Sequence, residues 1–418
     1  MELINYQGSK QLLVDYIYKE AKPFLDDQKV FCDIFSGSGA VTKYFLDKTA
    51  VYANDCENYA YAIADSFINY NYLLSNATIV YNEVNKFFNK NKSKLLDYYD
   101  QEVETEKKEI EKQNPFFIRD LYNKLPLIWN KNKQKFNYTL FSASSNKSDF
   151  DYLFTTYYAG SYFGIEQCVD LDSLHFAIKQ LEDIHIKNSL FSILFKIMQK
   201  SCFSRDGHLA QPLNCEKNFK RMIKSRSISI QNEFFSKLLD LKKQKNDSNN
   251  FQNSKAFKGD YREIINNEEI MKNISCIYAD PPYTDMQYSR YYHLFNTIYS
   301  YEYSEPTIQR NCFTKGLYLN NRYQSSLSQK KSALNDLALI MKQGNIYKIP
   351  VLISFAYPQN VEKQKTDRYL FSIEDLIQKA KYFYGNNNVK VAEKEYKHSN
   401  QRNSNQKKVI EYIVICKS

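Results

Sequence analysis

The sequence lacks the cysteine patterns of zinc-bound and disulfide-linked proteins. Its eight cysteines are scattered, with no Cys-x-x-Cys and no Cys/His pair at the spacing of zinc ligands. Cys32, Cys276 and Cys416 lie in apolar runs of the kind that form buried strands. We therefore expect free thiols in a reducing compartment, and we expect no bound metal.

Long apolar runs are also missing. No stretch approaches the roughly 18 apolar residues that a membrane-spanning helix requires. The first residues, Met1 to Tyr6, have neither the basic start nor the apolar core of a signal peptide. The sequence predicts a soluble cytoplasmic protein without a membrane partner.

Tryptophan occurs once, whereas there are 36 tyrosines and 28 phenylalanines, and the hydrophobic fraction of 43% is sufficient for a substantial core. The 418 residues allow one large domain with an insertion, or two or three domains. The formal net charge of +10 suits a polyanionic partner, although a composition rich in lysine and asparagine can also reflect codon bias.

A glycine-rich turn follows the first predicted strand, residues 29–35. Phe35, Ser36, Gly37 and Gly39 precede a predicted helix, so a ligand can approach the backbone and the positive end of that helix. The third glycine of the dinucleotide fingerprint is absent, and so is a Gly-Lys-Ser/Thr sequence for nucleotide phosphates. The turn therefore favours a nucleoside-like cofactor.

Three further residues near the N-terminus suit the same kind of ligand. Asp55 ends the next predicted strand about 20 residues beyond the turn, where an acid commonly accepts hydrogen bonds from ribose hydroxyls. It can equally cap the following helix. Gly8 permits close approach of the backbone, and Lys10 near a helix start either projects toward an anion or is a solvated surface lysine.

Residues 75–250 are mostly polar and helical in character, with an ordered loop expected at 204–212. Basic side chains follow that loop, at Lys217, Lys220, Arg221, Lys224 and Arg226. Such a run suits phosphate contacts, or it forms an ordinary basic surface. Residues 246–254 are the best candidate for a flexible linker.

The sequence Asp280-Pro281-Pro282-Tyr283 directly follows a predicted buried strand. The Asp280 carboxylate and the Pro281 carbonyl can both accept from one amino group, and Tyr283 offers a face on which a planar ring can stack. These residues describe a socket for the exocyclic amine of an aromatic base. The alternative is a strand that ends in a Pro-Pro turn.

Other polar residues of the C-terminal part suit the same ligands. Asp260, after Gly259, is placed to accept from an adenine amino group. Arg290 and His293 lie in an aromatic run that suits an unstacked base, and Arg322 lies in a polar loop. Residues 389–396 and 409–416 predict a C-terminal hairpin, which on a parallel sheet is typical of AdoMet-dependent methyltransferases.

Together these features resemble the alpha group of adenine-N6-specific DNA methyltransferases, in which a target-recognition insertion separates the cofactor-binding and catalytic halves. The resemblance is carried by the order of the motifs Tyr6-x-Gly8-x-Lys10, Phe35-x-Gly37-x-Gly39, Asp55, Gly259-Asp260-Tyr261 and Asp280-Pro281-Pro282-Tyr283. It implies an α/β fold: a Rossmann-like doubly wound sheet with a C-terminal β-hairpin, plus a mostly helical insertion. It also implies an AdoMet-binding catalytic domain at 1–74 and 255–418, and a DNA-binding insertion at 75–254.

The resemblance implies a role for each matched residue. The cofactor AdoMet would be held by Tyr6, Gly8, Lys10, Phe35, Ser36, Gly37, Gly39, Asp55, Asp260, Tyr261 and Asp280. Lys10 would pair with its carboxylate, Asp55 with its ribose and Asp260 with its adenine. The catalytic set would be Asp280, Pro281, Pro282 and Tyr283, which grip the target amine and stack on the flipped base. Gln7 departs from the family pattern, which often has a small residue or proline there.

The implied activity is that of a site-specific, adenine-specific DNA methyltransferase acting on double-stranded DNA, in a restriction–modification or defence system with a cognate restriction endonuclease. DNA contacts are expected from Lys220, Arg221, Arg290, His293 and Arg322. An RNA adenine as substrate and a catalytically silent DNA-binding subunit remain as alternatives. Asp280, where glutamine-modifying enzymes typically carry Asn, argues against a protein amide.

Overall fold

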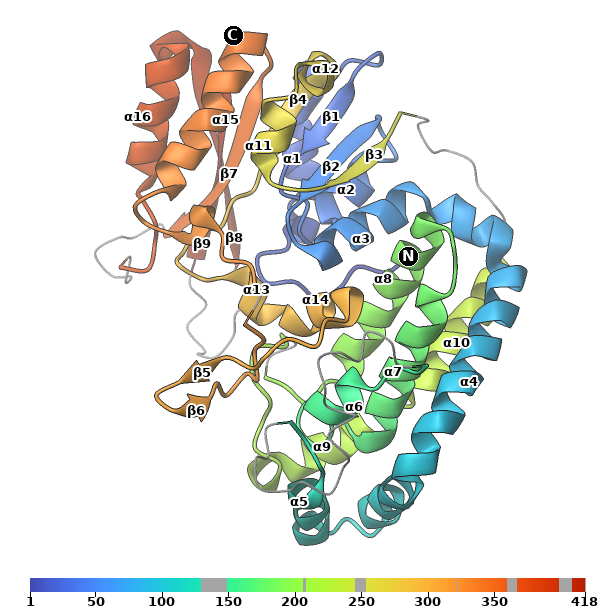
Figure 1. Cartoon of the computed structure of the whole chain (residues 1–418). Coiled ribbons are helices and arrows are strands. Elements are labelled where there is room, and N and C mark those ends of the chain that lie inside the picture. Colours follow the sequence, from blue (N-terminus) through green and yellow to red (C-terminus); the bar gives the residue numbers. More distant parts are fainter. Residues whose placement is uncertain are drawn as a thin grey trace. The chain divides into compact units, whose positions relative to one another are not determined.

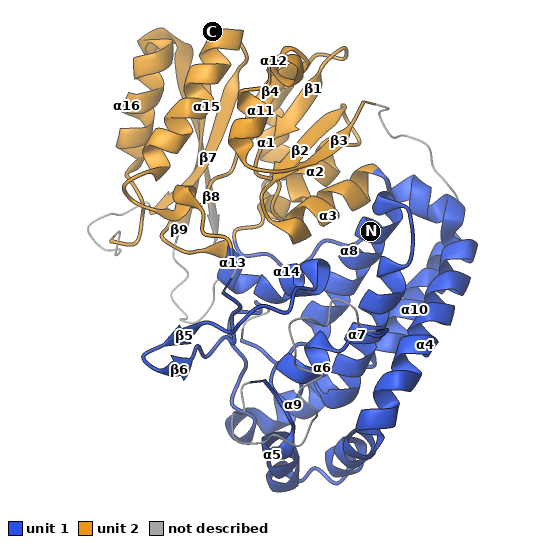
Figure 2. Cartoon of the chain, in the orientation of Figure 1, with its two compact units in different colours: residues 1–7, 69–248, 289–322 blue, residues 8–68, 249–288, 323–418 orange. Residues whose placement is uncertain are grey.

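The computed structural model describes residues 1–128, 149–205, 208–244, 253–320, 322–358, 367–397 and 408–417. The chain forms two compact units, coloured separately in Figure 2. The sheet unit comprises residues 8–68, 249–288 and 323–418, and the helical unit comprises residues 1–7, 69–248 and 289–322. Most of the predicted linker at 246–254, and two residues of the predicted loop at 204–212, lie outside the described residues.

The sheet unit is built on a seven-stranded, mostly parallel sheet with the order β3-β2-β1-β4-β7-β9-β8 (Figure 1). Its strands are β1 (Val30–Asp33), β2 (Val51–Asp55), β3 (Lys255–Lys258), β4 (Ile274–Ala279), β7 (Val351–Pro358), β8 (Val389–Lys397) and β9 (Lys408–Cys416). The strands β3, β2, β1, β4 and β7 pair in parallel, and β9 is antiparallel to both β7 and β8. The predicted α/β class and the C-terminal hairpin are confirmed, and the sheet is consistent with a methyltransferase fold.

Helices pack on both faces of this sheet because successive side chains of β1 point to opposite sides. Cys32 and Val30 enter a buried cluster with residues of α15 and α16, whereas Phe31 stacks on Phe45 of α2 at 3.9 Å between ring centroids. The α-helices of the sheet unit are α1 (Val14–Ala21), α2 (Ala40–Phe45), α3 (Asn58–Ile68), α11 (Tyr261–Ile265), α12 (Glu268–Lys272), α15 (Ala333–Tyr347) and α16 (Ile373–Tyr384). Short 3-10 turns lie at Lys10–Leu12 (η1), Lys22–Phe24 (η2), Ser326–Ser328 (η6) and Asn386–Asn388 (η7).

The helical unit is organised around α4 (Tyr70–Glu111), whose 42 residues bury one face. Buried positions such as Ala77, Val80, Val84 and Phe88 recur every three or four residues, as expected for an amphipathic helix. The other α-helices are α5 (Pro115–Lys124), α6 (Leu153–Tyr157), α7 (Ile165–Lys179), α8 (Ile184–Ser201), α9 (Phe219–Arg226), α10 (Ile230–Leu241) and α14 (His293–Ser300), and a 3-10 turn lies at Glu216–Asn218 (η5). One of the points at which the chain passes from one unit to the other falls in α13 (Tyr288–Tyr291). A small hairpin, β5 (Ile308–Gln309) with β6 (Cys312–Phe313), completes the unit.

All eight cysteines lie in described residues and are free, and Cys32, Cys276 and Cys416 are buried as predicted. Among the described helices, none combines the length and apolar character needed to cross a bilayer.

Candidate active site

The sheet brings several of the predicted cofactor and catalytic residues to one edge. Neighbouring parallel strands end on the same side, and ligands of such sheets bind at the carboxyl ends where the strand order reverses. In the order β3-β2-β1-β4, these ends carry Asp260, Asp55, the glycine turn and Asp280 (Figure 1). Segments more than 200 residues apart in the chain thus meet at one rim of the sheet unit.

The glycine turn is held in shape by Asp55. Its Oδ2 accepts from the backbone N–H of Gly37 at 2.9 Å, and its Oδ1 accepts from the backbone N–H of Glu57 at 2.9 Å. Burial raises the pKa of Asp55, and these backbone hydrogen bonds oppose the shift. Both sequence-based roles of Asp55 therefore remain open: it caps the start of the next segment, and its carboxylate also lies at the turn.

Position 39 requires glycine, because of its backbone conformation and because neighbouring side chains leave no room for a Cβ atom. Its φ is +71°, and a Cβ there would lie 2.7 Å from Cε2 of Phe67. We expect Gly39→Ala to cost about 1–2 kcal/mol for the left-handed backbone and about 1–3 kcal/mol more for the overlap. Gly385→Ala isolates the backbone cost of a side chain at positive φ, because Gly385 has φ +78° and ψ 161° and a Cβ added there would meet nothing within 4 Å. Thermal unfolding of both variants measures the difference; equal losses would contradict the steric account.

Lys10 is buried within a cluster of charged and hydroxyl groups. Its side chain is 3% exposed, and its Nζ lies 3.0 Å from Oδ1 of Asp280 and 3.1 Å from Oε1 of Glu411. It also donates to the Tyr283 hydroxyl, which in turn donates to Oδ1 of Asp280. The ammonium lies 4.6 Å from the centre of the Tyr283 ring. A solvated surface position, which the sequence left open for Lys10, is therefore wrong.

The Asp280 carboxylate is one-fifth exposed, and its contacts with Lys10 and Tyr283 both fall on Oδ1. Burial raises the pKa of Asp280, the nearby Lys10 ammonium opposes that shift, and the Glu411 carboxylate adds to it. Tyr283 is fixed from the side by an edge-to-face contact with Phe355, with ring centroids 5.6 Å apart. The site therefore holds one reachable carboxylate beside a positioned aromatic ring.

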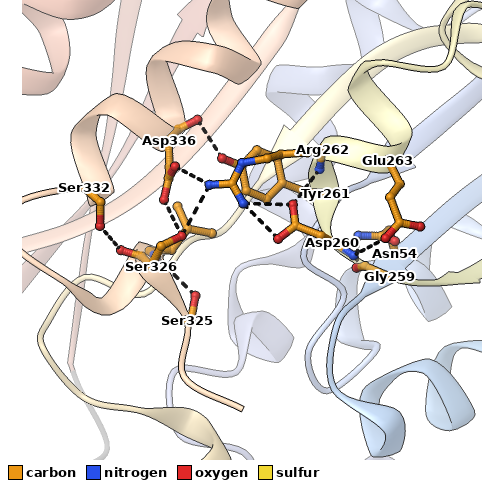
Figure 3. Close-up of polar contacts among 11 residues, drawn as sticks. Asn54, Gly259, Asp260, Tyr261, Arg262, Glu263, Ser325, Ser326, Ser332 and Asp336 are labelled. Atoms are coloured by element: carbon orange, nitrogen blue, oxygen red, sulfur yellow. Dashed lines mark hydrogen bonds and ion pairs between the residues drawn. The ribbon is translucent and has the colours of Figure 1, made fainter.

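At the β3 end, Asp260 is bound by an arginine (Figure 3). Nη1 of Arg262 lies 3.1 and 2.9 Å from the two oxygens of Asp260, and Nη2 of the same side chain donates to Asp336 at 2.5 Å. Asp336 also accepts from the Ser326 hydroxyl at 2.6 Å. This network fixes the plane of the Asp260 carboxylate, so that an adenine amino group would meet an oriented acceptor.

Three buried polar atoms near the ends of β1 and β2 have no hydrogen-bond partner among the described residues. They are Oγ of Ser36, Oδ1 of Asn54 and Oδ1 of Asp33. Burial raises the pKa of Asp33 to about 7, while the Thr42 hydroxyl donates to its other oxygen at 2.7 Å. Unpaired buried acceptors are costly, and a ligand with ammonium and hydroxyl donors would satisfy such groups.

Tyr6 and the candidate DNA-binding residues belong to the helical unit. Tyr6 stacks on Tyr292 with ring centroids 4.6 Å apart. His293 is 4% exposed, its Nε2 donates to the Leu209 carbonyl at 3.0 Å, and burial lowers its pKa to about 3. The His293 side chain is thus packed in the interior of the helical unit.

The predicted basic residues divide between surface and interior. The guanidinium groups of Arg290 and Arg322 lie 5.7 and 5.2 Å from the ring centre of Tyr318. Lys220 and Arg221 are exposed on α9, and Arg221 donates to the Ser204 carbonyl at 2.6 Å. Arg226, from the same basic run, is instead buried beside Tyr122 and Glu106.

Sequence reasoning missed Glu411, Arg262 and Asp336. A signal existed for Glu411, which is the one acid in the otherwise apolar run from Val409 to Cys416. No comparable signal marks Asp336, because it reaches Arg262 only through the packing of α15 beside α11.

The model of the D12 class N6 adenine-specific DNA methyltransferase family matches residues 6–203. The predicted resemblance to adenine-N6-specific DNA methyltransferases is thereby confirmed. The matched span includes Lys10, the glycine turn and Asp55, and it ends before Asp260 and Asp280.

Among individual proteins, the modification methylase LlaI of Lactococcus lactis subsp. lactis is 22% identical over 406 residues. The similarity covers 97% of this chain and 53% of that protein, so the chain spans about half the length of this relative. Among the described residues, no group of three or more His, Cys, Asp or Glu side chains is arranged to hold a metal ion.

Proposed function

We propose that the chain is a site-specific DNA methyltransferase that transfers a methyl group from AdoMet to the exocyclic amine of a flipped-out adenine in duplex DNA. The observation that carries the proposal is the convergence of Lys10, Asp280 and Tyr283 at the carboxyl end of β4, next to the strand that bears the glycine turn. The family match and the named modification methylase support this class of reaction.

The cofactor would lie along the rim formed by β1, β2 and β3. The glycine turn would let it approach the backbone, Asp55 would bind its ribose hydroxyls and Asp260 would bind its adenine amino group. The unpaired oxygens of Ser36 and Asp33 fit a donor-rich, positively charged ligand. When bound, AdoMet supplies an electrophilic methyl group on a sulfonium that is already a good leaving group.

The target amine would be held by Asp280 and the Pro281 carbonyl. An adenine amine is a weak nucleophile because its lone pair is delocalised into the ring. Accepting its two hydrogens favours a more tetrahedral nitrogen, whose lone pair can point at the methyl group. The contribution of the protein is therefore alignment and charge placement. Oδ2 of Asp280 is suited to this contact because Lys10 and Tyr283 engage Oδ1.

Methylation of mixed-sequence DNA tests the proposal. Purified protein is incubated with labelled AdoMet and either duplex DNA or RNA, and the product nucleosides are separated. We expect label in N6-methyladenine from duplex DNA. Label confined to RNA would support the RNA alternative, and DNA binding without transfer to either nucleic acid would support a silent subunit.

We further propose that the sheet unit binds the cofactor while the helical unit recognises DNA, as a modification enzyme with a cognate nuclease. Affinity for duplex DNA should then fall steeply with salt, by about 0.9 in the logarithmic slope per phosphate contact. We expect Arg290→Ala and Arg322→Ala each to reduce that slope by about 1, whereas Lys381→Ala on α16 leaves it unchanged. Fluorescence anisotropy across a salt series measures the slope. A flat dependence would make the helical unit a protein-interaction surface.

A further inference from the structure

Glu411 is a fully buried acid on the C-terminal hairpin. It lies on β9 opposite Ala356 of β7, and its side chain has no exposed surface. Oε1 accepts from the Ser354 hydroxyl and lies 3.1 Å from Nζ of Lys10. Oε2 has no hydrogen-bond partner among the described residues. Burying a charged carboxylate in this environment lowers the stability of the folded state unless a specific partner of opposite charge stabilises it.

Lys10 serves two carboxylates at nearly equal distances. Its ammonium lies 3.0 Å from Asp280 and 3.1 Å from Glu411. The two acids differ in access, since the Asp280 side chain is 20% exposed and that of Glu411 is not exposed. A ligand amine can therefore compete with Lys10 at Asp280, but not at Glu411.

We propose that Glu411 is a positioning residue that retains the Lys10 ammonium while Asp280 exchanges its bond with Lys10 for one with the target amine. The inference rests on the proposed methyltransferase function. Of the carboxylates in the described residues, only Asp280 and Glu411 are seen within 4 Å of the Lys10 ammonium, so without Glu411 the departure of Lys10 from Asp280 would remove its second carboxylate contact within the chain. With Glu411 present, both carboxylates lie within hydrogen-bond distance of the Lys10 ammonium. Lys10 can therefore give up its bond to Asp280 and keep its ion pair with Glu411.

The electrostatics of the cluster give this role a distinct pH signature. The charged and titratable groups that face Asp280 or Glu411 are Lys10 on η1, Tyr16 on α1, Asp33 on β1, Tyr278 on β4, Tyr283, and Tyr369. Among them, the Glu411 charge raises the pKa of Asp280. Neutralising Glu411 removes this repulsion and also gives Asp280 a larger share of Lys10, and both changes lower the pKa of Asp280.

The test is Glu411→Gln, which keeps the size of the side chain and removes its charge. We expect the maximal methylation rate to fall about tenfold, since Asp280 holds Lys10 more tightly. The acid limb of the pH–rate profile should move to lower pH by about one unit. Binding of AdoMet should change less than threefold. A wild-type acid limb in a folded Glu411→Gln protein would overturn the proposal.

Two further variants separate positioning from packing. Glu393→Gln makes the same chemical change at an exposed site of β8, and neither rate nor acid limb should move. Glu411→Asp keeps the charge but shortens its reach, so the rate should fall while the acid limb stays within about half a unit of wild type. A shift of the acid limb in Glu393→Gln would equally overturn the assignment.

A measurement on the protein alone distinguishes this inference from the proposed function. With ¹³C-labelled aspartate, the Asp280 carboxyl signal is identified by its loss in Asp280→Asn and then titrated. A lower titration midpoint in Glu411→Gln supports the Glu411 role even if the wild-type protein methylates no adenine. An unchanged midpoint rejects it even if methylation is observed.

Discussion

Asp280→Ala is expected to lower the rate of methyl transfer by at least about a thousandfold, as for loss of a central electrostatic group. The substitution removes the reachable carboxylate beside Tyr283 and leaves Lys10 paired with Glu411. Because the glycine turn and Asp55 are not altered, affinity for AdoMet should stay within about threefold of wild type. Incorporation of labelled methyl groups measures the rate, and titration calorimetry measures the affinity.

Asp285→Ala is the matched control for this experiment. Asp285 follows the same loop, but it is exposed and pairs with Arg368 at 3.0 Å. Its loss should leave transfer and AdoMet binding unchanged. Normal methylation by Asp280→Ala would remove Asp280 from the catalytic set, and with it the socket as proposed.

Lys10→Met is expected to destabilise the sheet unit by about 3–5 kcal/mol at neutral pH, because it leaves the buried Glu411 and the partly buried Asp280 without their shared cation. Burial raises the pKa of Asp280 above that of the unfolded chain, so the folded form binds the extra proton. Stability of the variant should therefore recover fully only below about pH 4, and it should be lost progressively as pH rises from there through neutrality. Thermal unfolding between these values measures the effect.

Affinity for AdoMet should also fall in Lys10→Met, since Lys10 is the residue proposed to meet the cofactor carboxylate. Lys19→Met on the exposed face of α1 is the control, and it should change stability by no more than about 0.5 kcal/mol. A Lys10→Met protein as stable as wild type at all pH values would show that Asp280 and Glu411 are not held by this ammonium.

The C-terminal hairpin and the central strands were predictable because their patterns are local. Val351 to Phe355 is apolar except at Ser354, as expected for a strand with both faces covered, and the structure extends this strand to Pro358. The turn from Phe35 to Gly39 was predictable for the same reason, since its glycines need positive φ values of their own.

The ion pairs of the site were not predictable from local pattern. The resemblance implied a cofactor carboxylate, and no residue of the chain, as the partner of Lys10, and Arg262 was left unremarked. The carboxylates of Glu411 and Asp336 lie about 400 and 70 residues away along the chain and are brought close by the sheet order and by α15. His293 shows the converse case. Its aromatic and basic neighbours in the sequence suggested DNA contact, whereas its surroundings in the fold are the Leu209 carbonyl and Tyr318.

The sequence by itself determined which chemistry is proposed, since the glycine turn, Asp55 and Asp280-Pro281-Pro282-Tyr283 follow one another in the order of the resembled family. The tertiary structure decided which charged side chains pair in the active site and how their protonation depends on one another. Lys10, Asp280 and Glu411 come from the start, the middle and the end of the chain, and burial together makes their charges interdependent. Electrostatic coupling depends on distance and desolvation, and neither quantity can be obtained from residue order.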